Sequence, residues 1–214
     1  MPVRPITIDG LVAELAATIG AAAPGAWLRV ALDGAPPTRP GTLADDLVDP
    51  VRLRGRPVLR VRAADYLRPA SLRFERGRTD PDAFYDDWLD VSGLAREVLR
   101  PLAADGAGRV LPSRWDAVAD RASRADYVEL PVGGVVLVDG QLLLGRGLDW
   151  DLTVHLALSP AALDRQLAEP DRWTRPAYRR YAADVDPERL ADVVVRMDHA
   201  DRPAVLHNRV HGDS

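Results

Sequence analysis

The chain has 214 residues, of which 47% are hydrophobic and 28% charged, and its formal net charge is −4. This length and composition predict one globular domain with a substantial core. The acidic balance argues against nucleic acid or a membrane surface as the main partner. The sequence contains no cysteine, which excludes disulfides, thiolate zinc sites and a cysteine nucleophile. No apolar run approaches the roughly 20 residues that span a bilayer, and the first ten residues do not resemble a signal peptide. We therefore expect a cytoplasmic protein.

The N-terminal segment predicts an amphipathic helix that packs on the outside of the main domain. Its apolar side chains recur at helical spacing, and they are Leu11, Val12, Leu15, Ile19 and Ala22. A Pro-Gly pair ends this helix before the first strand. We therefore divide the chain into an N-terminal helical element over residues 1–26, a main domain over 27–200 and a loose tail over 201–214.

Residues 27–47, read as WLRVALDGAPPTRPGTLADDL, are the stretch around which we expect the domain to be organised. The apolar run at 27–32 predicts a strand, Gly34 begins a loop, and an amphipathic helix follows from about Thr42. A strand, a glycine-led loop and a helix form the arrangement of a phosphate-binding loop. In such a loop, backbone N–H groups and the helix N-terminus hold an anion.

This loop departs from the pattern G-x-x-x-x-G-K-[ST] of phosphate-binding loops. Counted from Gly34, Arg39 stands at the second glycine, Pro40 at the lysine and Gly41 at the Ser/Thr, while Thr42 supplies a hydroxyl one residue later. Three prolines remove N–H donors, and the chain contains no lysine at all. Two interpretations remain open. The loop is either a modified anion site that uses arginine, or only a proline-rich connection between strand and helix.

Downstream, apolar strand-like runs alternate with helical segments, which predicts an α/β fold with a doubly wound parallel sheet. The expected elements are strand 58–62, helix 91–102, short strands at 109–111 and 127–130, a loop or helical turn at 115–123, buried strand 133–140, strand 151–158, a helix from Pro160 with Ser159 as its N-cap, and a last strand at 191–195.

Two carboxylates follow predicted strands, and the carboxyl ends of parallel strands are where ligands bind in α/β sheets. Asp65 comes after strand 58–62, and Asp139 ends strand 133–140. Asp139 is either a magnesium-binding carboxylate, as at the equivalent strand of phosphate-loop proteins, or a turn-former before Gly140. The four histidines suggest neither a metal site nor a catalytic triad, and His155 is expected to be a core or strand-face residue.

The order of these segments resembles the uridine kinase-like branch of the P-loop nucleoside kinases, especially its short actinobacterial-type members. The pieces that carry the resemblance span about residues 27–196, and they are LRVALDG…TLADDL, VLRVRAADYLRP, RGRTDPDAFYDDWLD, VVLVDGQLLL, DLTVHLALSP and ADVVV. The resemblance implies a P-loop NTPase-like sheet with flanking helices. It also implies ATP and Mg²⁺ as cofactors if the protein is a kinase.

Carried over by position, the resemblance makes Asp65 the group that accepts the proton of the acceptor hydroxyl. It places Asp139, with Thr42, near the metal, and it gives the phosphate-binding role to Gly34, Arg39, Gly41 and Thr42. The acceptor pocket would be lined by Tyr66, Arg73, Arg76 and Tyr85. A shortened lid over residues 165–182 would contribute Arg165, Arg172 and Arg175. The loop departs from the family pattern because it lacks the lysine and the second glycine.

Three functions follow as hypotheses. The first is a diverged kinase-like protein that keeps an acceptor-type pocket around Asp65 but has lost or altered ATP-dependent phosphoryl transfer. It would bind a nucleoside-like or hydroxylated small molecule, or run different chemistry on it. The second is an active kinase in which arginine replaces the loop lysine. The third is a non-catalytic partner protein that uses the fold as a scaffold. The loop prolines favour the first and third.

Overall fold

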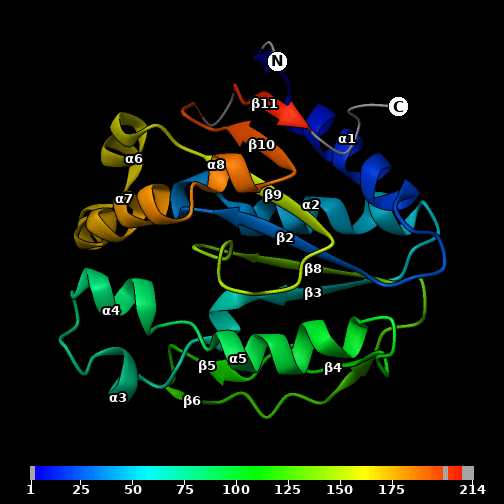
Figure 1. Ribbon diagram of the computed structural model, residues 1–214, viewed down its shortest axis with the longest axis horizontal. Coiled ribbons are helices and arrows are strands. Elements are labelled where there is room, and N and C mark those ends of the chain that lie inside the picture. The colour runs from blue at the N-terminus through cyan, green and yellow to red at the C-terminus, as the bar shows by residue number, and fades with distance from the viewer. Residues whose placement is uncertain (1–2, 200–201, 209–214) are drawn as a thin grey trace.

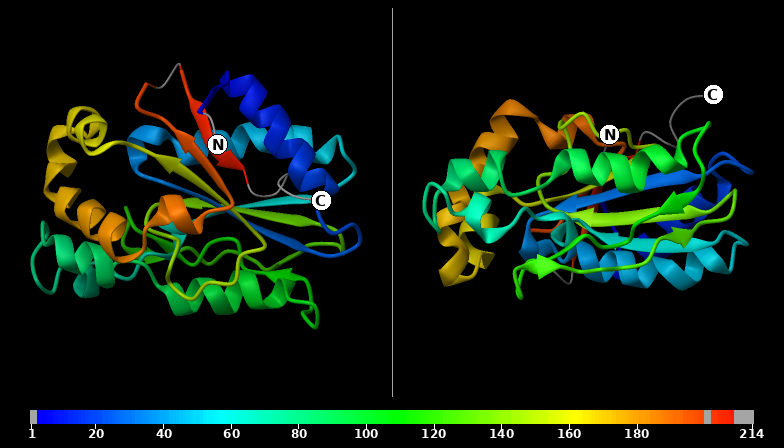
Figure 2. Two further views of the ribbon diagram at one scale, coloured as in Figure 1. Left: turned by 45° about the horizontal axis from the view of Figure 1, so that its top comes forward. Right: turned by 90° about the horizontal axis from the view of Figure 1, so that it is seen from below.

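The computed structural model describes residues 3–199 and 202–208. A seven-stranded sheet runs through it, in the order β1-β11-β10-β9-β2-β8-β3, with helices on both faces (Figures 1 and 2). The five strands from β10 to β3 pair in parallel, whereas β11 and β1 add an antiparallel edge. The predicted α/β fold with a doubly wound, mostly parallel sheet is confirmed.

The strands of the main sheet are β1 (Arg4–Pro5), β2 (Leu28–Gly34), β3 (Val58–Arg62), β8 (Val135–Gly140), β9 (Leu152–Ala157), β10 (Val193–Arg196) and β11 (Ala204–Asn208). Two small hairpins pair β4 (Arg109–Val110) with β7 (Val128–Glu129) and β5 (Trp115–Asp116) with β6 (Arg121–Ala122). The helices are α1 (Ile8–Ala21), α2 (Pro40–Arg52), α3 (Ala70–Arg73), α4 (Pro81–Asp86), α5 (Val91–Leu94), α6 (Pro160–Gln166), α7 (Arg175–Asp184) and α8 (Pro187–Leu190). Helical turns continue α5 as far as Leu102.

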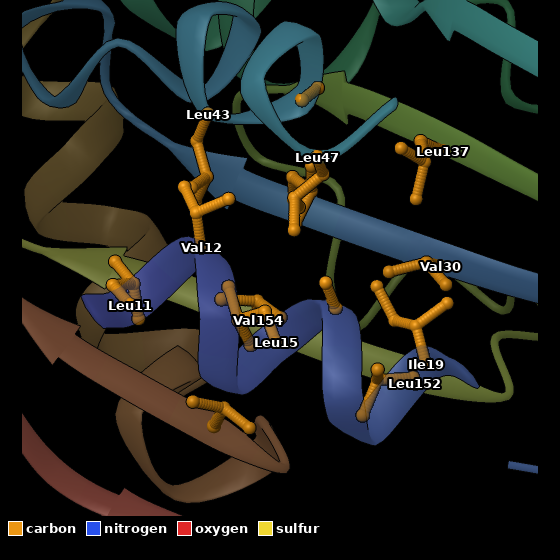
Figure 3. Close-up of a cluster of buried hydrophobic side chains, with 14 of the residues drawn as sticks. Leu11, Val12, Leu15, Ile19, Val30, Leu43, Leu47, Leu137, Leu152 and Val154 are labelled. Atoms are coloured by element: carbon orange, nitrogen blue, oxygen red, sulfur yellow. The ribbon is translucent and has the colours of Figure 1, made fainter. Parts of the chain in front are cut away.

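Helices α1 and α2 cover one face of the sheet, and Figure 3 shows how their side chains meet the strands. Leu15 and Ile19 of α1 and Leu47 of α2 are fully buried against Val30 and Val154. The opposite face is covered by α5 with its following turns and by α4 and α7. Burial of the parallel strands on both faces explains their continuous apolar sequences.

The structure differs from the sequence-based expectations in two segments. Residues 115–123, expected as a loop or helical turn, form the β5–β6 hairpin, because the Asp116 carboxylate accepts the N–H groups of Val118 and Ala119 and so closes a turn. Residues 204–208, expected within a loose tail, form β11, so β10 is not the last strand. Residues 209–214 of that tail lie outside the described residues.

One local expectation agrees with the structure, and another differs from it by two residues. Ser159 caps α6 by accepting the N–H of Ala162 at 3.3 Å, with Pro160 at the first helical position, as predicted. Helix α2 begins at Pro40 rather than near Thr42. Within the described part of the chain, no helix is both long and apolar enough to span a bilayer.

Candidate functional site

A cavity of about 370 Å³ lies at the carboxyl ends of β2, β8 and β3, against the loop that joins β2 to α2. We call it the loop cavity, and we call residues 34–42 the phosphate loop. The lining is mostly apolar, and it consists of Gly34, Pro36, Arg39, Pro40, Gly41, Thr42, Ala63, Ala64, Leu67, Phe84, Trp88, Leu89, Asp139, Gly140, Gln141, Leu142 and Arg146. A cavity at this end of the strands is the expected ligand site of an α/β sheet.

The phosphate loop keeps the backbone path of an anion-binding loop at two points. A side chain at Gly34 would meet Thr38 Oγ1 at 2.4 Å and Leu156 Cβ at 2.9 Å, so only glycine fits there. Arg39, at the position of the second glycine, adopts a left-handed conformation with φ of 54°. That conformation costs a non-glycine residue about 1 kcal/mol. Gly34 therefore has no room for a side chain, and position 39 holds an arginine in a conformation that favours glycine.

The loop prolines change what the backbone can donate. They wind residues 36–38 into a 3-10 turn that consumes two N–H groups, because Thr38 donates to the Ala35 carbonyl at 2.9 Å and Arg39 to the Pro36 carbonyl at 3.0 Å. Proline itself donates nothing. In the part of the loop that follows Gly34, the N–H groups of Ala35, Gly41 and Thr42 have no described hydrogen-bond partner.

Arg60 provides a fixed positive charge beneath the loop. It lies on β3, and its Nη2 donates to Asp139 Oδ1 at 2.5 Å while its Nη1 donates to the Gly41 carbonyl at 3.0 Å and to Asp45. The Asp139 side chain is only 12% exposed. Its burial raises the pKa of this carboxyl, and the Arg60 guanidinium opposes that rise. Arg60 therefore already neutralises the carboxylate that the sequence suggested as a metal ligand.

These residues do not fit a Mg²⁺ site. Magnesium in nucleotide sites is held by one or two protein oxygens, with water and phosphate completing its octahedron, and here one Asp139 oxygen is already bound by Arg60. Gly41 lies beside the other oxygen, since a Cβ built on it would be 3.1 Å from Asp139 Oδ2, but it carries no hydroxyl. Thr42 lines the same cavity without a described contact to Asp139. Among the described residues, no group of three acidic or histidine side chains is placed to hold a metal.

Asp65 lies next to the loop cavity but not in its lining. Its carboxylate accepts Arg62 Nη2 at 2.9 Å and Nε at 3.1 Å. It lines an adjoining hollow of about 710 Å³ together with Asp116 and Arg121, and Ala64 is shared by the two hollows. The assignment of Asp65 as a proton acceptor therefore stays a prediction, and it would require the acceptor hydroxyl to reach the second hollow.

The four residues predicted to line the acceptor pocket surround the loop cavity without lining it. Tyr66 is fully buried and donates to the Leu111 carbonyl, and burial raises the pKa of its hydroxyl. Arg73 is buried, and its Nε donates to the Arg68 carbonyl at 2.7 Å. Their role in recognising an acceptor stays a prediction.

The other two lie nearer the surface. Arg76 forms an ion pair with Asp87, and the Tyr85 ring lies 5.0 Å from the Arg146 guanidinium carbon and 4.2 Å from that of Arg180. Phe84 and Trp88, from the same segment, line the cavity instead, with their rings packed edge to face at 5.1 Å. The resemblance selected Tyr85 from this segment, whereas the aromatic side chains that line the cavity are Phe84 and Trp88.

The three arginines predicted for the lid are engaged elsewhere. Arg165 donates to the Asp198 carbonyl at 3.2 Å, and Arg172 and Arg175 form ion pairs with Glu169 and Asp164. None of them lines the loop cavity.

Two arginines that the sequence analysis did not select lie at the loop cavity or beside it. Arg146 lines the cavity and is held by the carbonyls of Leu142 and Tyr85, while Arg60 lies beneath the loop. Nothing in the local sequence marks Arg146. Arg60 had a weak signal, since it is a charge in the middle of the otherwise apolar start of β3.

The sheet order, the glycine-led loop after β2 and the cavity beside it define a P-loop kinase fold. No family model matches the sequence, and no curated protein matches it. Among solved structures, the chain is similar to a possible uridine kinase from Bacillus stearothermophilus, with 22% identity, a TM-score of 0.69, and 86% of this chain and 96% of that chain covered. It is also similar to a proposed fructose transport system kinase from Silicibacter sp., with 24% identity, a TM-score of 0.59, and coverage of 87% and 92%. The resemblance to the uridine kinase-like fold is confirmed.

Proposed function

We propose that this protein is a diverged relative of the nucleoside kinases that binds a small hydroxylated, nucleoside-like molecule and does not carry out ordinary Mg·ATP-dependent phosphoryl transfer. The observation that carries the proposal is the contact of Arg60 with both Asp139 and the Gly41 carbonyl. It supplies an internal cation where a kinase would present a lysine and a metal ion.

The energetic argument rests on charge and on hydrogen-bond donors. Phosphoryl transfer depends on positioning and on neutralising the charge that develops on the phosphoryl oxygens. Loss of one well-placed donor to such an oxygen costs about 3–4 kcal/mol of transition-state stabilisation. Here the loop contains three prolines and no lysine, and its 3-10 turn uses two further N–H groups. Several such losses together favour a loop that no longer supports efficient transfer.

The lining supports retention of a small-molecule ligand. Phe84 and Trp88 offer an aromatic wall, and a few polar groups, including Gln141 and Arg146, are placed around it. An apolar cavity with a small number of convergent polar groups is the usual form of a small-molecule site. A flat heterocycle with a hydroxylated substituent satisfies both features.

One observation favours the alternative, an active kinase that uses arginine. The Arg39 side chain is exposed, lines the loop cavity and has no described hydrogen-bond or ion-pair partner. Together with the free N–H groups of Gly41 and Thr42, its guanidinium could hold a phosphate. In this alternative Arg39 replaces the lysine and Asp65 orients the acceptor hydroxyl.

Calorimetric titration separates these functions. We expect no measurable binding of Mg·ATP or Mg·GTP up to millimolar concentration, and saturable binding of uridine that Trp88→Leu weakens by at least tenfold. Arg4→Gln, which changes only an exposed ion pair with Glu14 outside the lining of the cavity, is the control and should bind as the unaltered protein does. Micromolar binding of Mg·ATP with formation of a phosphorylated nucleoside would overturn the proposal in favour of the alternative. Binding of neither ligand would favour a scaffold.

A further inference from the structure

A second cavity, of about 350 Å³, lies behind the phosphate loop between the end of β9 and helices α6, α7 and α8. We call it the histidine cavity. Gly34 and Leu142 line both this cavity and the loop cavity, so they form the wall between the two. The histidine cavity contains a set of polar contacts that the proposed function does not use.

Asp33 is the centre of these contacts. It lies on β2, is completely buried, and is paired in register with His155 on the neighbouring strand β9. Its carboxylate accepts three hydrogen bonds, from His155 Nδ1 at 2.7 Å, from the Tyr181 hydroxyl at 3.0 Å and from the Leu143 N–H at 2.9 Å. With three donor groups directed at it, the Asp33 carboxylate acts as a hydrogen-bond acceptor.

The contact with the Asp33 carboxylate determines the tautomer of His155. Because the Asp33 carboxylate accepts the hydrogen bond from Nδ1, Nδ1 carries a proton. In the neutral ring, Nε2 then carries the lone pair. His155 is 8% exposed and lines the cavity. No described residue forms a hydrogen bond with Nε2. The atom is nevertheless not fully enclosed, since it is not among the buried side-chain atoms that lack a partner. Solvent or a ligand in the cavity therefore reaches this nitrogen.

The walls around Nε2 are largely apolar. Leu156, Leu163 and Pro187 are buried side chains of the lining. Glu188 forms an ion pair with Arg196, whose Nη2 donates to Oε2 at 3.0 Å. The charged groups left at the rim are the exposed Arg179 and Asp186, one of each sign. An acceptor without a described partner in a largely apolar lining favours a ligand that carries a hydrogen-bond donor on an apolar body, because an unmet polar group in such a place is costly.

We propose that the histidine cavity is a second ligand site, for a small and largely apolar molecule whose hydroxyl or N–H group donates a hydrogen bond to His155 Nε2. Asp33 is a positioning residue for this site, since it fixes the tautomer and the orientation of the ring. The site is distinct from the nucleoside-like ligand proposed for the loop cavity, and it does not depend on that proposal.

Nitrogen NMR of the full ¹⁵N-labelled chain tests the site directly, with cyclohexanol as the probe and cyclohexanone as its match in size without a donor. With the His155 ring neutral, we expect its Nε2 to be the lone-pair nitrogen in the free protein. Its resonance should shift and saturate with cyclohexanol, with a dissociation constant at least tenfold lower than for cyclohexanone. A protonated Nε2, equal affinity for the two probes, or no shift would each overturn the proposal.

Two variants separate this site from the loop cavity. His155→Gln identifies the resonance and should abolish the preference for cyclohexanol, whereas Trp88→Leu, in the loop cavity, should leave it unchanged. A result in which Trp88→Leu removes the preference would overturn the assignment of the probe to the histidine cavity. If His155→Gln does not fold, the tautomer and the probe titration of the unaltered protein still decide. Uridine should not shift His155, so failure of either ligand site is recognised independently.

Discussion

Two aspartates end neighbouring parallel strands, and their surroundings differ in kind. Asp33 of β2 is fully buried and is stabilised by an imidazole, a phenol and a backbone N–H. Asp139 of β8 is nearly buried and is bound by the guanidinium of Arg60. One carboxylate is held by hydrogen bonds, whereas the other is held by an ion pair with a guanidinium.

The difference explains why the two cavities suit different ligands. A carboxylate paired with a guanidinium has little remaining demand for a divalent cation, which is why the loop cavity does not fit the metal of a working kinase. A carboxylate that accepts the Nδ1 proton of an imidazole leaves Nε2, on the far side of the ring, as a hydrogen-bond acceptor. An aspartate at the same end of two adjacent strands thus disfavours a metal ion in the loop cavity and orients a hydrogen-bond acceptor in the histidine cavity.

The largest expected effect comes from removing the cation on one side of this comparison. Arg60→Met leaves Asp139 as a nearly buried carboxylate without its partner, and loss of one member of such a pair costs about 3–5 kcal/mol. We expect the free energy of unfolding, measured by urea denaturation, to fall by that amount.

A surface pair on the same strand provides the matched control. Arg62 is 64% exposed and pairs with Asp65 at 2.9 Å, so Arg62→Gln should cost less than about 1 kcal/mol. Replacing both partners, as Arg60→Met with Asp139→Leu, should recover most of the loss. If the double variant is as unstable as Arg60→Met alone, the loss does not arise from the unpaired carboxylate.

On the other side of the comparison, removing one neutral donor should have a smaller effect. Tyr181→Phe takes one of three hydrogen bonds from Asp33 and leaves the Leu144 N–H, which donates to the same hydroxyl at 3.0 Å, without its partner. A hydrogen bond to a charged group contributes about 1.5–3 kcal/mol. We expect a loss of about 2 kcal/mol in urea denaturation.

Tyr85→Phe is the control for this loss, because the Tyr85 hydroxyl has no hydrogen bond to any described residue while its ring is also packed among aromatic and cationic side chains. It should leave stability within about 0.5 kcal/mol. Equal losses in the two variants would mean that the hydroxyl of Tyr181 contributes nothing specific to Asp33.

A third prediction asks whether the loop cavity can be turned back toward a nucleotide site. In the Arg60→Met background, the changes Arg39→Gly, Pro40→Lys and Gly41→Thr restore the missing loop chemistry. Glycine relieves the left-handed conformation at position 39, and loss of the guanidinium makes room near Asp139 for a side chain at position 41. We expect Mg·ATP to bind at least about tenfold more tightly than to Arg60→Met alone, equivalent to about 1.4 kcal/mol, in calorimetric titration.

The same three loop changes in the presence of Arg60 form the control. There the new lysine and the guanidinium compete for one region, so the gain in affinity should be smaller. An equal gain with and without Arg60 would show that Arg60 does not obstruct nucleotide binding.

The sequence was sufficient for the fold because the fold depends on patterns that local residues carry. The continuous apolar run of β8 and the strand–loop–helix order around Gly34 predicted a parallel sheet correctly. The edge strand β11 was missed: it pairs with β10, which directly precedes it in the chain, and with the two-residue strand β1 from the other end of the chain.

The site was less predictable because its chemistry depends on which side chains meet across strands. Arg60 and Asp139 are separated by 79 residues, and Asp33 and His155 by 122 residues. The sequence gives no spacing rule for such pairs. His155 was predicted as a core or strand-face residue, which is correct for its burial, but its partner depends on the register of β2 with β9.

The last prediction concerns the pH dependence of the first variant. Burial raises the pKa of Asp139, and Arg60 opposes this rise, so Arg60→Met should raise the pKa further. A folded carboxyl with a raised pKa holds its proton more tightly than the unfolded one, whose pKa is about 3.9. Stability from this group is therefore greatest at low pH and is lost as the pH rises from the unfolded pKa to the folded one.

The deficit of Arg60→Met relative to the unaltered protein should accordingly be largest near neutral pH and shrink on acidification. Each unit by which the folded pKa rises contributes about 1.4 kcal/mol, so we expect the deficit to fall by about 1 kcal/mol between pH ~7 and ~4. Urea midpoints across that range measure it. In Arg60→Met with Asp139→Asn, position 139 cannot titrate, and the deficit should vary less with pH. A deficit of Arg60→Met that stays constant across the range would place the cost in lost packing of the Arg60 stem rather than in the charge of Asp139.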